Sequence, residues 1–323
     1  MSYTGGHTTG LSPDACQTAI DGVIWESYMR EQQPVYLSSR DELFFRQSNA
    51  DEMVYVWDED SNVGAFRETG EQETITSDDT FLANQKTARQ RKWMKQIPVS
   101  FEAFKTDQAG VGKRAKIGQQ VGDRARLTQD SLTIQDTYGD AFAGSVTTCP
   151  DGVAAASNSH VLVKTGGALD NLETGVLNAD NLWTVVQSLA NQKAQDGEAG
   201  SQLFEGIVVP FILLKTAKET LDSDLVPFSG ENQVNFFDTV YGQVRIAASV
   251  FLGSTYNTAT NANTSYHVVS SNVQASRRKL ADLSMDLIDP TKTDNDTYVE
   301  RARYMESHFW ASWFGLVSSN GTV

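Results

Sequence analysis

A short glycine-containing stretch is the part of this sequence that comes nearest to a nucleotide-binding motif. Gly110-Val-Gly112-Lys113 resembles the end of a phosphate-binding loop, in which backbone amides and a lysine hold phosphate groups. The full motif needs glycine at the position of Asp107 and a serine or threonine at that of Arg114. Without that hydroxyl there is no magnesium ligand, and nothing strand-like leads directly into the loop. The sequence therefore favours the plain start of a helix here over nucleotide binding.

An acidic stretch begins like a calcium-binding loop. Asp58, Asp60 and Asn62 occupy its first, third and fifth positions. The sixth position, however, is Val63 rather than glycine, and the twelfth is Thr69 rather than glutamate. The sequence favours a polar turn over a calcium site.

The histidines and cysteines show no catalytic or metal-binding pattern. The four histidines are scattered without metal-ligand spacing: His7, His160, His267 and His308. Ser159-His160 beside Asp151 could be taken for part of a catalytic triad, but no GxSxG elbow accompanies it. Cys16 and Cys149 form no CxxC pair and are expected to be reduced thiols. We predict no catalytic residue, no cofactor and no metal site, and hence no enzyme.

A basic run from Lys86 to Lys95, interleaved with Trp93, has the composition of a nucleic-acid contact. The chain around it is strongly acidic, with 41 acidic against 26 basic residues and a formal charge of −15. A sequence-independent grip on nucleic acid needs basic surface that replaces counterions. The balance therefore favours pairing of this run with acidic surface on a neighbouring subunit.

Length and hydropathy limit the classes of protein to which this chain can belong. A chain of 323 residues fits roughly two domains. The first residues carry no basic segment followed by an apolar run, so no signal peptide is predicted. The most apolar segment, residues 207–214, is far shorter than the ~20 residues needed to cross a bilayer. We expect a soluble, non-exported protein that does not enter a membrane.

The sequence predicts one long amphipathic helix over residues 111–132. Small or apolar residues recur at steps of three and four over residues 111–132 and form one narrow stripe: Val111, Ala115, Gly118, Gly122, Ala125, Thr128 and Leu132. Such a helix does not fill a core, so we expect it to lie across a sheet with one edge closely packed. The two glycines permit close packing or a bend.

The N-terminal third of the chain predicts an arm and a projecting loop. Ser12 and Pro13 suit the cap and first turn of a helix that extends to about Glu31, after a mobile tail. Residues 53–57 are β-prone, a polar turn follows at residues 58–62, and residues 96–101 read as a returning strand. About forty mostly polar residues between these limbs indicate a long loop held by partners.

The C-terminal half predicts an α/β layer. A helix is expected from Asn178, then a buried strand over residues 207–210, a helix over residues 211–221 and further strands over residues 236–251. A polar loop at residues 257–265 precedes another extended segment at residues 266–269. The aromatic residues near the C-terminus predict an ordered, docked end: Tyr304, Phe309, Trp310, Trp313 and Phe314.

Several weak motifs in a fixed order resemble one known family. They are Trp93-Met-Lys-Gln-Ile-Pro-Val-Ser-Phe-Glu, Asp107-Gln108 before the long helix, Cys-Pro-Asp151-Gly152-Val153, Ser157-Asn-Ser-His160 and Gly206-Ile-Val-Val-Pro210. Together, over roughly residues 90–323, they resemble the Mu-like family of tailed-phage major head subunits. Ala155-Ala156 replaces the bulkier residues often found before the serine.

The resemblance implies an α+β chain with the Hong Kong 97-type capsid fold. The implied parts are an N-terminal arm (1–50), an extended β-hairpin loop or E-loop (51–99), a peripheral domain with a long spine helix (100–177), an axial α/β domain (178–277) and a C-terminal return to the peripheral domain (278–323). The candidate inter-subunit contacts are Trp57, Arg67, Lys86, Arg89, Arg91, Lys92 and Lys95.

The implied function is that of a major capsid protein, which self-assembles into the icosahedral shell around the genome of a tailed double-stranded DNA phage. Its implied partners are further copies in pentamers and hexamers, portal and scaffolding proteins, decoration proteins, and packaged DNA without sequence-specific binding. The implied location of the protein is the virion, after assembly in the bacterial cytoplasm. The alternative is another virion structural protein, a decoration or tail component.

Overall fold

The computed structural model describes residues 26, 28, 35–60, 82–100, 112–223, 236–241, 244–257, 261–288 and 297–322. The strands are β1 (Arg46–Asn49), β2 (Val54–Asp60), β3 (Leu82–Arg89), β4 (Arg91–Ser100), β5 (His160–Val161), β6 (Ala168–Leu169), β7 (Leu172–Glu173), β8 (Gly206–Pro210), β9 (Arg245–Ser249), β10 (Tyr266–Val269), β11 (Ala275–Ile288), β12 (Thr297–Trp310) and β13 (Leu316–Ser319). The helices are α3 (Gly112–Ile134), the π-helix η1 (Gln135–Gly139), α4 (Ala179–Ala190), the 3-10 helices η2 (Phe211–Leu213) and η3 (Val250–Leu252), α5 (Leu214–Leu221) and α6 (Phe236–Tyr241).

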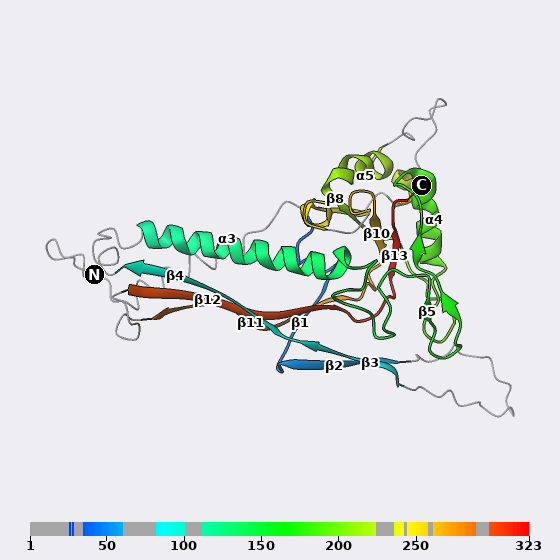
Figure 1. Ribbon diagram of the computed structural model, residues 1–323. Helices are drawn as coiled ribbons and strands as arrows, with labels where there is room; N and C mark the ends of the chain where they lie inside the picture. Colours follow the sequence, from blue (N-terminus) through cyan, green and yellow to red (C-terminus); the bar gives the residue numbers. More distant parts are fainter. Residues whose placement is uncertain are drawn as a thin grey trace, which may run out of the picture.

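The elongated half of the molecule is a four-stranded sheet with α3 laid along it (Figure 1). The strand order is β1-β11-β12-β4, and β11 and β12 are antiparallel strands of 14 residues each. β4 pairs with β12 from Arg91 to Ser100, so the predicted returning strand exists but begins earlier than residue 96. The sequence did not predict β11.

The long helix predicted from the small-residue stripe is confirmed as α3. Gly118 and Gly122 are buried, and the α-helix runs without a break through both glycines. Thr128 departs from the predicted stripe, because its side chain is exposed and donates a hydrogen bond to the Arg124 carbonyl at 2.7 Å. Val121 lies on the buried side in addition to the glycines.

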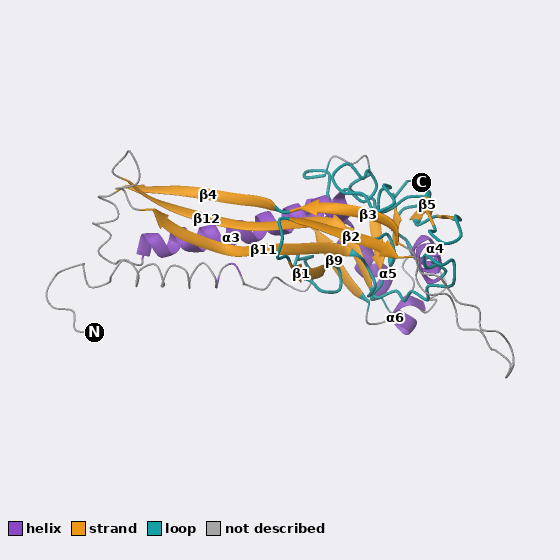
Figure 2. Ribbon diagram, turned by 90° about the horizontal axis from the view of Figure 1, so that it is seen from below, coloured by secondary structure: helices purple, strands orange, loops and turns teal. Residues whose placement is uncertain are grey.

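A two-stranded hairpin, β2 with β3, lies on the other side of the long sheet from α3 (Figures 1 and 2). Trp57 of β2 stacks on Phe309 of β12 with ring centroids 4.1 Å apart. The polar turn predicted at residues 58–62 is wrong in its first part, since β2 continues through Asp60. Residues 61–81, which hold the rest of the predicted loop, and most of the predicted N-terminal helix lie outside the described residues.

The second half of the molecule is a five-stranded sheet, order β7-β13-β10-β8-β9, covered by α4 and α5. The predicted helix at Asn178 is confirmed: the Asn178 side chain caps α4 by accepting from the Asn181 amide at 2.8 Å. The predicted buried strand is β8, which is buried along its whole length, and the helix predicted after it is divided into η2 and α5. Residues 236–251 were expected to be strands, but α6 occupies residues 236–241 and only β9 is extended.

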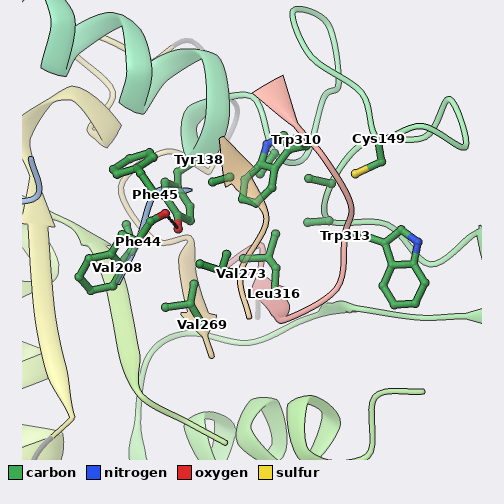
Figure 3. Packing of buried hydrophobic residues seen from close by; sticks show 14 of the residues in the cluster. Phe44, Phe45, Tyr138, Cys149, Val208, Val269, Val273, Trp310, Trp313 and Leu316 are labelled. Carbon is green, nitrogen blue, oxygen red and sulfur yellow. Dashed lines mark hydrogen bonds between the residues drawn. The ribbon is translucent and has the colours of Figure 1, made fainter. Parts of the chain in front are cut away.

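One hydrophobic core joins the two halves (Figure 3). It contains Tyr138 from η1, Trp310 from β12 and Val208 from β8. The Trp310 indole N–H donates to the Thr137 carbonyl at 3.2 Å, and the Tyr138 hydroxyl donates to the Phe44 carbonyl at 2.8 Å. The expectation of an ordered C-terminal aromatic segment is confirmed there. β13 lies in the five-stranded sheet rather than beside the long strands.

Candidate assembly interface

The predicted basic run is divided between two strands that face different surroundings. β3 ends at Arg89 and β4 begins at Arg91. Lys86 points inward: its ammonium group donates to the carbonyl and hydroxyl oxygens of Thr148 and, at 3.2 Å, to the Cys149 carbonyl. Burial lowers the pKa of Lys86, although the Cys149 and Asp151 side chains oppose the shift. Lys86 thus anchors the hairpin to the loop after η1.

Three of the other basic residues of the run are exposed on the surface, and one pairs with an acidic side chain of the same chain. Arg89, Lys92 and Lys95 are exposed. Arg91 is half-exposed and donates to Asp136 of η1 at 3.3 Å. The run is therefore not one continuous basic patch, and the exposed part consists of Arg89, Lys92 and Lys95.

Trp57 is used within the chain. Its side chain is 7% exposed, and its indole N–H donates to the Ala311 carbonyl at 3.1 Å. It forms a small cluster with Phe309 and Ala88 that holds the hairpin on the sheet. Arg67, the remaining predicted contact residue, lies outside the described residues.

Glu59 provides a second anchor for the hairpin and was missed by the sequence analysis. It accepts hydrogen bonds from Gln195 at 2.6 Å, from Ser312 at 2.8 Å and from Asn84 at 3.3 Å. Burial raises the pKa of its carboxyl group, and these three hydrogen bonds oppose the shift. The acidic stretch that resembled a calcium loop therefore binds neighbouring side chains.

An apolar groove separates part of α3 from the long sheet. It has a volume of about 870 Å³ and is lined on the sheet side by Trp93, Met94, Ile97, Leu283, Ala302 and Tyr304. From α3 it is lined by Ile117, Val121 and Leu127 among others. Within the described residues, neither the Trp93 indole N–H nor the Tyr304 hydroxyl has a hydrogen-bond partner. The groove gives this half of the molecule an apolar surface that its own described residues do not fill.

A second exposed apolar surface lies where β8 and β9 end. Tyr36 and Phe211 stack there with ring centroids 5.8 Å apart, and both rings are partly exposed. Ile212 beside them is 66% exposed and Val250 is also exposed. Exposed clusters of large apolar side chains on a folded chain commonly mark interaction surfaces.

The residues that resembled catalytic motifs have structural partners. His160 contacts Asp151 through Nδ1 at 2.7 Å and stacks on Trp313 with ring centroids 5.2 Å apart. The Ser159 hydroxyl contacts the Ser157 hydroxyl at 2.9 Å, and within the described residues the His160 ring nitrogens contact Asp151 and the Ala155 carbonyl rather than Ser159. The described part of the chain also has no group of three side chains suited to hold a metal ion. His160 holds a turn, as the sequence favoured.

The sequence did not indicate that residues of β11 and β12 line the apolar groove under α3. β12 alternates, but its inward positions include Glu300, Glu306 and His308, which are buried. A strand with charged residues on its buried face lacks the apolar alternation that predicts a strand. As strand positions, Tyr304 and Ala302 therefore carried no recognisable signal, and the sequence indicated only that the aromatic C-terminal segment is ordered.

The geometry defines a class of architecture: an elongated α+β chain with a long helix along a long sheet, a projecting hairpin and a second α/β layer. No helix in the described residues is both long and apolar enough to span a membrane. No protein-family model and no curated protein matches the sequence.

Solved shell structures share this architecture. The mature capsid of bacteriophage PhiM1 aligns with a TM-score of 0.57 at 12% identity, over 90% of this chain and 89% of that chain. The capsid of an empty GTA particle aligns with a TM-score of 0.57 at 8% identity, over 91% and 92% of the two chains. A virus-like particle from Pyrococcus furiosus aligns with a TM-score of 0.51 at 10% identity, over 94% and 98%. The chain has the Hong Kong 97-type capsid fold, as the resemblance implied.

Proposed function

We propose that this chain is the major capsid protein of a tailed double-stranded DNA phage, of the Mu-like head-subunit kind. The observation that carries the proposal is the full-length match to capsid subunits, which leaves about a tenth of either chain unaligned in the PhiM1 comparison. The motif order in the sequence favours the Mu-like kind. Copies would form pentamers and hexamers of an icosahedral shell in the virion, after assembly in the bacterial cytoplasm.

On this proposal, each part of the fold corresponds to a part of a capsid subunit. The long sheet with α3 would be the peripheral domain, and the five-stranded sheet with α4 and α5 the axial domain. The hairpin β2–β3 would be the base of the E-loop, and the residues before β1 the arm. Because β13 pairs with β10 and β7, the C-terminal segment would contribute to both domains.

The unfilled surfaces would be covered by neighbours in the shell. Obligate interfaces bury on the order of 2,000–5,000 Å² or more and are rich in apolar side chains. A subunit that forms them therefore exposes apolar surface until its neighbours bind. The groove under α3 and the Tyr36–Phe211 surface supply apolar area, and Arg89, Lys92 and Lys95 supply charge for an acidic surface on the next copy. Closed rings of such contacts prevent growth into filaments.

The acidic balance suits a container for DNA. A formal charge of −15 gives the inner wall little affinity for phosphates, so DNA slides past it during packaging. Portal, scaffolding and decoration proteins are the further partners that the role requires. Strong, salt-dependent DNA binding by free subunits would contradict this part of the proposal.

Electron microscopy of the expressed full-length chain, alone and with its neighbouring head genes, tests the proposal. We expect closed shells tens of nanometres across. Tubes would instead assign the chain to a tail. Small particles of uniform size, with no closed shells, would overturn the shell function.

A further inference from the structure

His308 of β12 lies between two buried carboxylates. Its Nδ1 forms a hydrogen bond of 3.2 Å with Oδ2 of Asp136, and its Nε2 lies 3.3 Å from Oε1 of Glu306 in an ion-pair contact without hydrogen-bond geometry. All three side chains are at most 11% exposed. A neutral imidazole has one N–H and one lone pair, so it can face only one acceptor favourably. Two carboxylates on opposite sides of the ring fit the doubly protonated, cationic form.

Two arginines complete the cluster. Arg277 of β11 donates from Nε at 2.9 Å and from Nη2 at 2.8 Å to Oε2 of Glu306. Arg91 of β4 contacts Asp136, but its side chain is 48% exposed and solvent screens its charge. If His308 is neutral, Asp136 keeps only this screened cation. The charge balance at Asp136 therefore depends on the proton of His308.

The cluster ties together four elements at one place. Asp136 lies in η1, the wide π-turn that continues α3, and such turns often occur at functional positions. Glu306 and His308 belong to β12, Arg277 to β11 and Arg91 to β4. Among the described residues, the other titratable neighbours are Tyr28, which lies against Arg277, Tyr304 of β12, and Lys279, which is opposite Glu306 on β11 and pairs with Asp282. Burial raises the pKa of Tyr304, so this phenol stays neutral.

We propose that Asp136, His308, Glu306 and Arg277 form a protonation-controlled clamp that fastens the C-terminal end of α3 to the long sheet. The clamp is closed while His308 carries its proton and loosens when that proton is lost. It is a property of the folded chain and does not depend on shell assembly.

The direction of the pH response follows from two shifts. Burial acts to lower the pKa of His308, but the contacts with Asp136 and Glu306 outweigh it and raise the pKa above the usual 6.5. Burial acts to raise the pKa of Glu306, but His308 and Arg277 outweigh it and lower the pKa below 4.5. Stability from His308 is complete below pH 6.5 and is lost as the pH rises through its folded value. Stability from Glu306 is complete above pH 4.5 and is lost in stronger acid.

Hydrogen–deuterium exchange of the full-length chain measures the clamp directly. After correction for the intrinsic rate, we expect opening at residues 134–139 to be about tenfold more frequent at about pH 8.5 than at about pH 5.5. Replacement of His308 by glutamine (H308Q) removes the titrating group, so opening should be frequent at both pH values. H267Q is the control for a buried histidine that does not titrate, because burial lowers the pKa of His267 to about 3 and keeps its ring neutral throughout. Since the His267 ring packs on Tyr138 at 5.3 Å, the comparison uses the ratio of opening between the two pH values, which should stay about tenfold in H267Q.

The near-isosteric D136N variant provides a second test should H308Q fold poorly. Removal of one carboxylate lowers the pKa of His308, so opening should begin at a lower pH than in the wild type. Equal protection of residues 134–139 at both pH values in the wild type would overturn the clamp. A wild-type pH response in H308Q would do the same.

Discussion

The two ends of α3 differ in how they meet the long sheet. At the C-terminal end, Ile134 and Tyr138 are fully buried and join the core shared by both halves of the molecule. Toward the N-terminal end, Ile117 lines an open groove of about 870 Å³. The first region is completed by the chain's own side chains, and the second presents apolar surface that the described residues leave uncovered. Among the described residues, α3 is therefore packed into a core at one end and borders an open groove toward the other.

Removing a buried charge at the anchored end should have the largest effect. Arg277→Met leaves Glu306, whose side chain is 0% exposed, without the guanidinium group that donates two hydrogen bonds to its Oε2. We expect the free energy of unfolding to fall by about 3–5 kcal/mol. Urea unfolding followed by tryptophan fluorescence measures this. Arg303→Met is the matched control, because the Arg303–Asp286 pair is more than 40% exposed on both sides and should contribute at most about 1 kcal/mol.

A matched pair of isoleucines compares the two ends by packing alone. Ile134→Ala should cost about 2–5 kcal/mol, because the cavity forms in a filled core. Ile117→Ala should cost less than about 1 kcal/mol in the free subunit, because the groove is already open. The same urea experiment on unassembled protein makes the comparison. Equal costs would show that the groove end is as tightly packed as the core.

The hairpin anchor at Lys86 is expected to have an intermediate effect. Lys86→Met keeps the length of the side chain but leaves the Thr148 and Cys149 carbonyls without their donor. We expect a loss of about 1–2 kcal/mol and faster proteolysis between β2 and β3. Unchanged proteolysis in this variant would argue against an anchoring role.

Charge reversal on the exposed part of the basic run should have the smallest effect on the subunit itself. Lys92→Glu changes an exposed side chain and should alter the free energy of unfolding by no more than about 0.5 kcal/mol. On the shell proposal, the yield of closed particles should nevertheless fall. Particle counts by electron microscopy test this, and unimpaired assembly of a combined reversal at Arg89, Lys92 and Lys95 would exclude the proposed contact.

The sequence by itself determined the elements whose burial follows a local period. The small-residue stripe identified α3, the capping asparagine and apolar face identified α4, and the apolar run identified β8. These signals are local, because helix and strand periodicity place neighbouring residues on one face. The order of weak motifs then indicated the fold to which these elements belong.

Only the tertiary structure decided β11, β12 and the roles of the charged residues. Glu306 and His308 are buried beside their hydrogen-bond partners Arg277 and Asp136, which lie 29 and 172 residues away along the chain. Lys86 turned inward, while Lys92 stayed exposed, because only the former meets carbonyl groups of the loop after η1. A buried charge is stable only beside its partner, and partners that are distant in sequence leave no local pattern from which their meeting can be predicted.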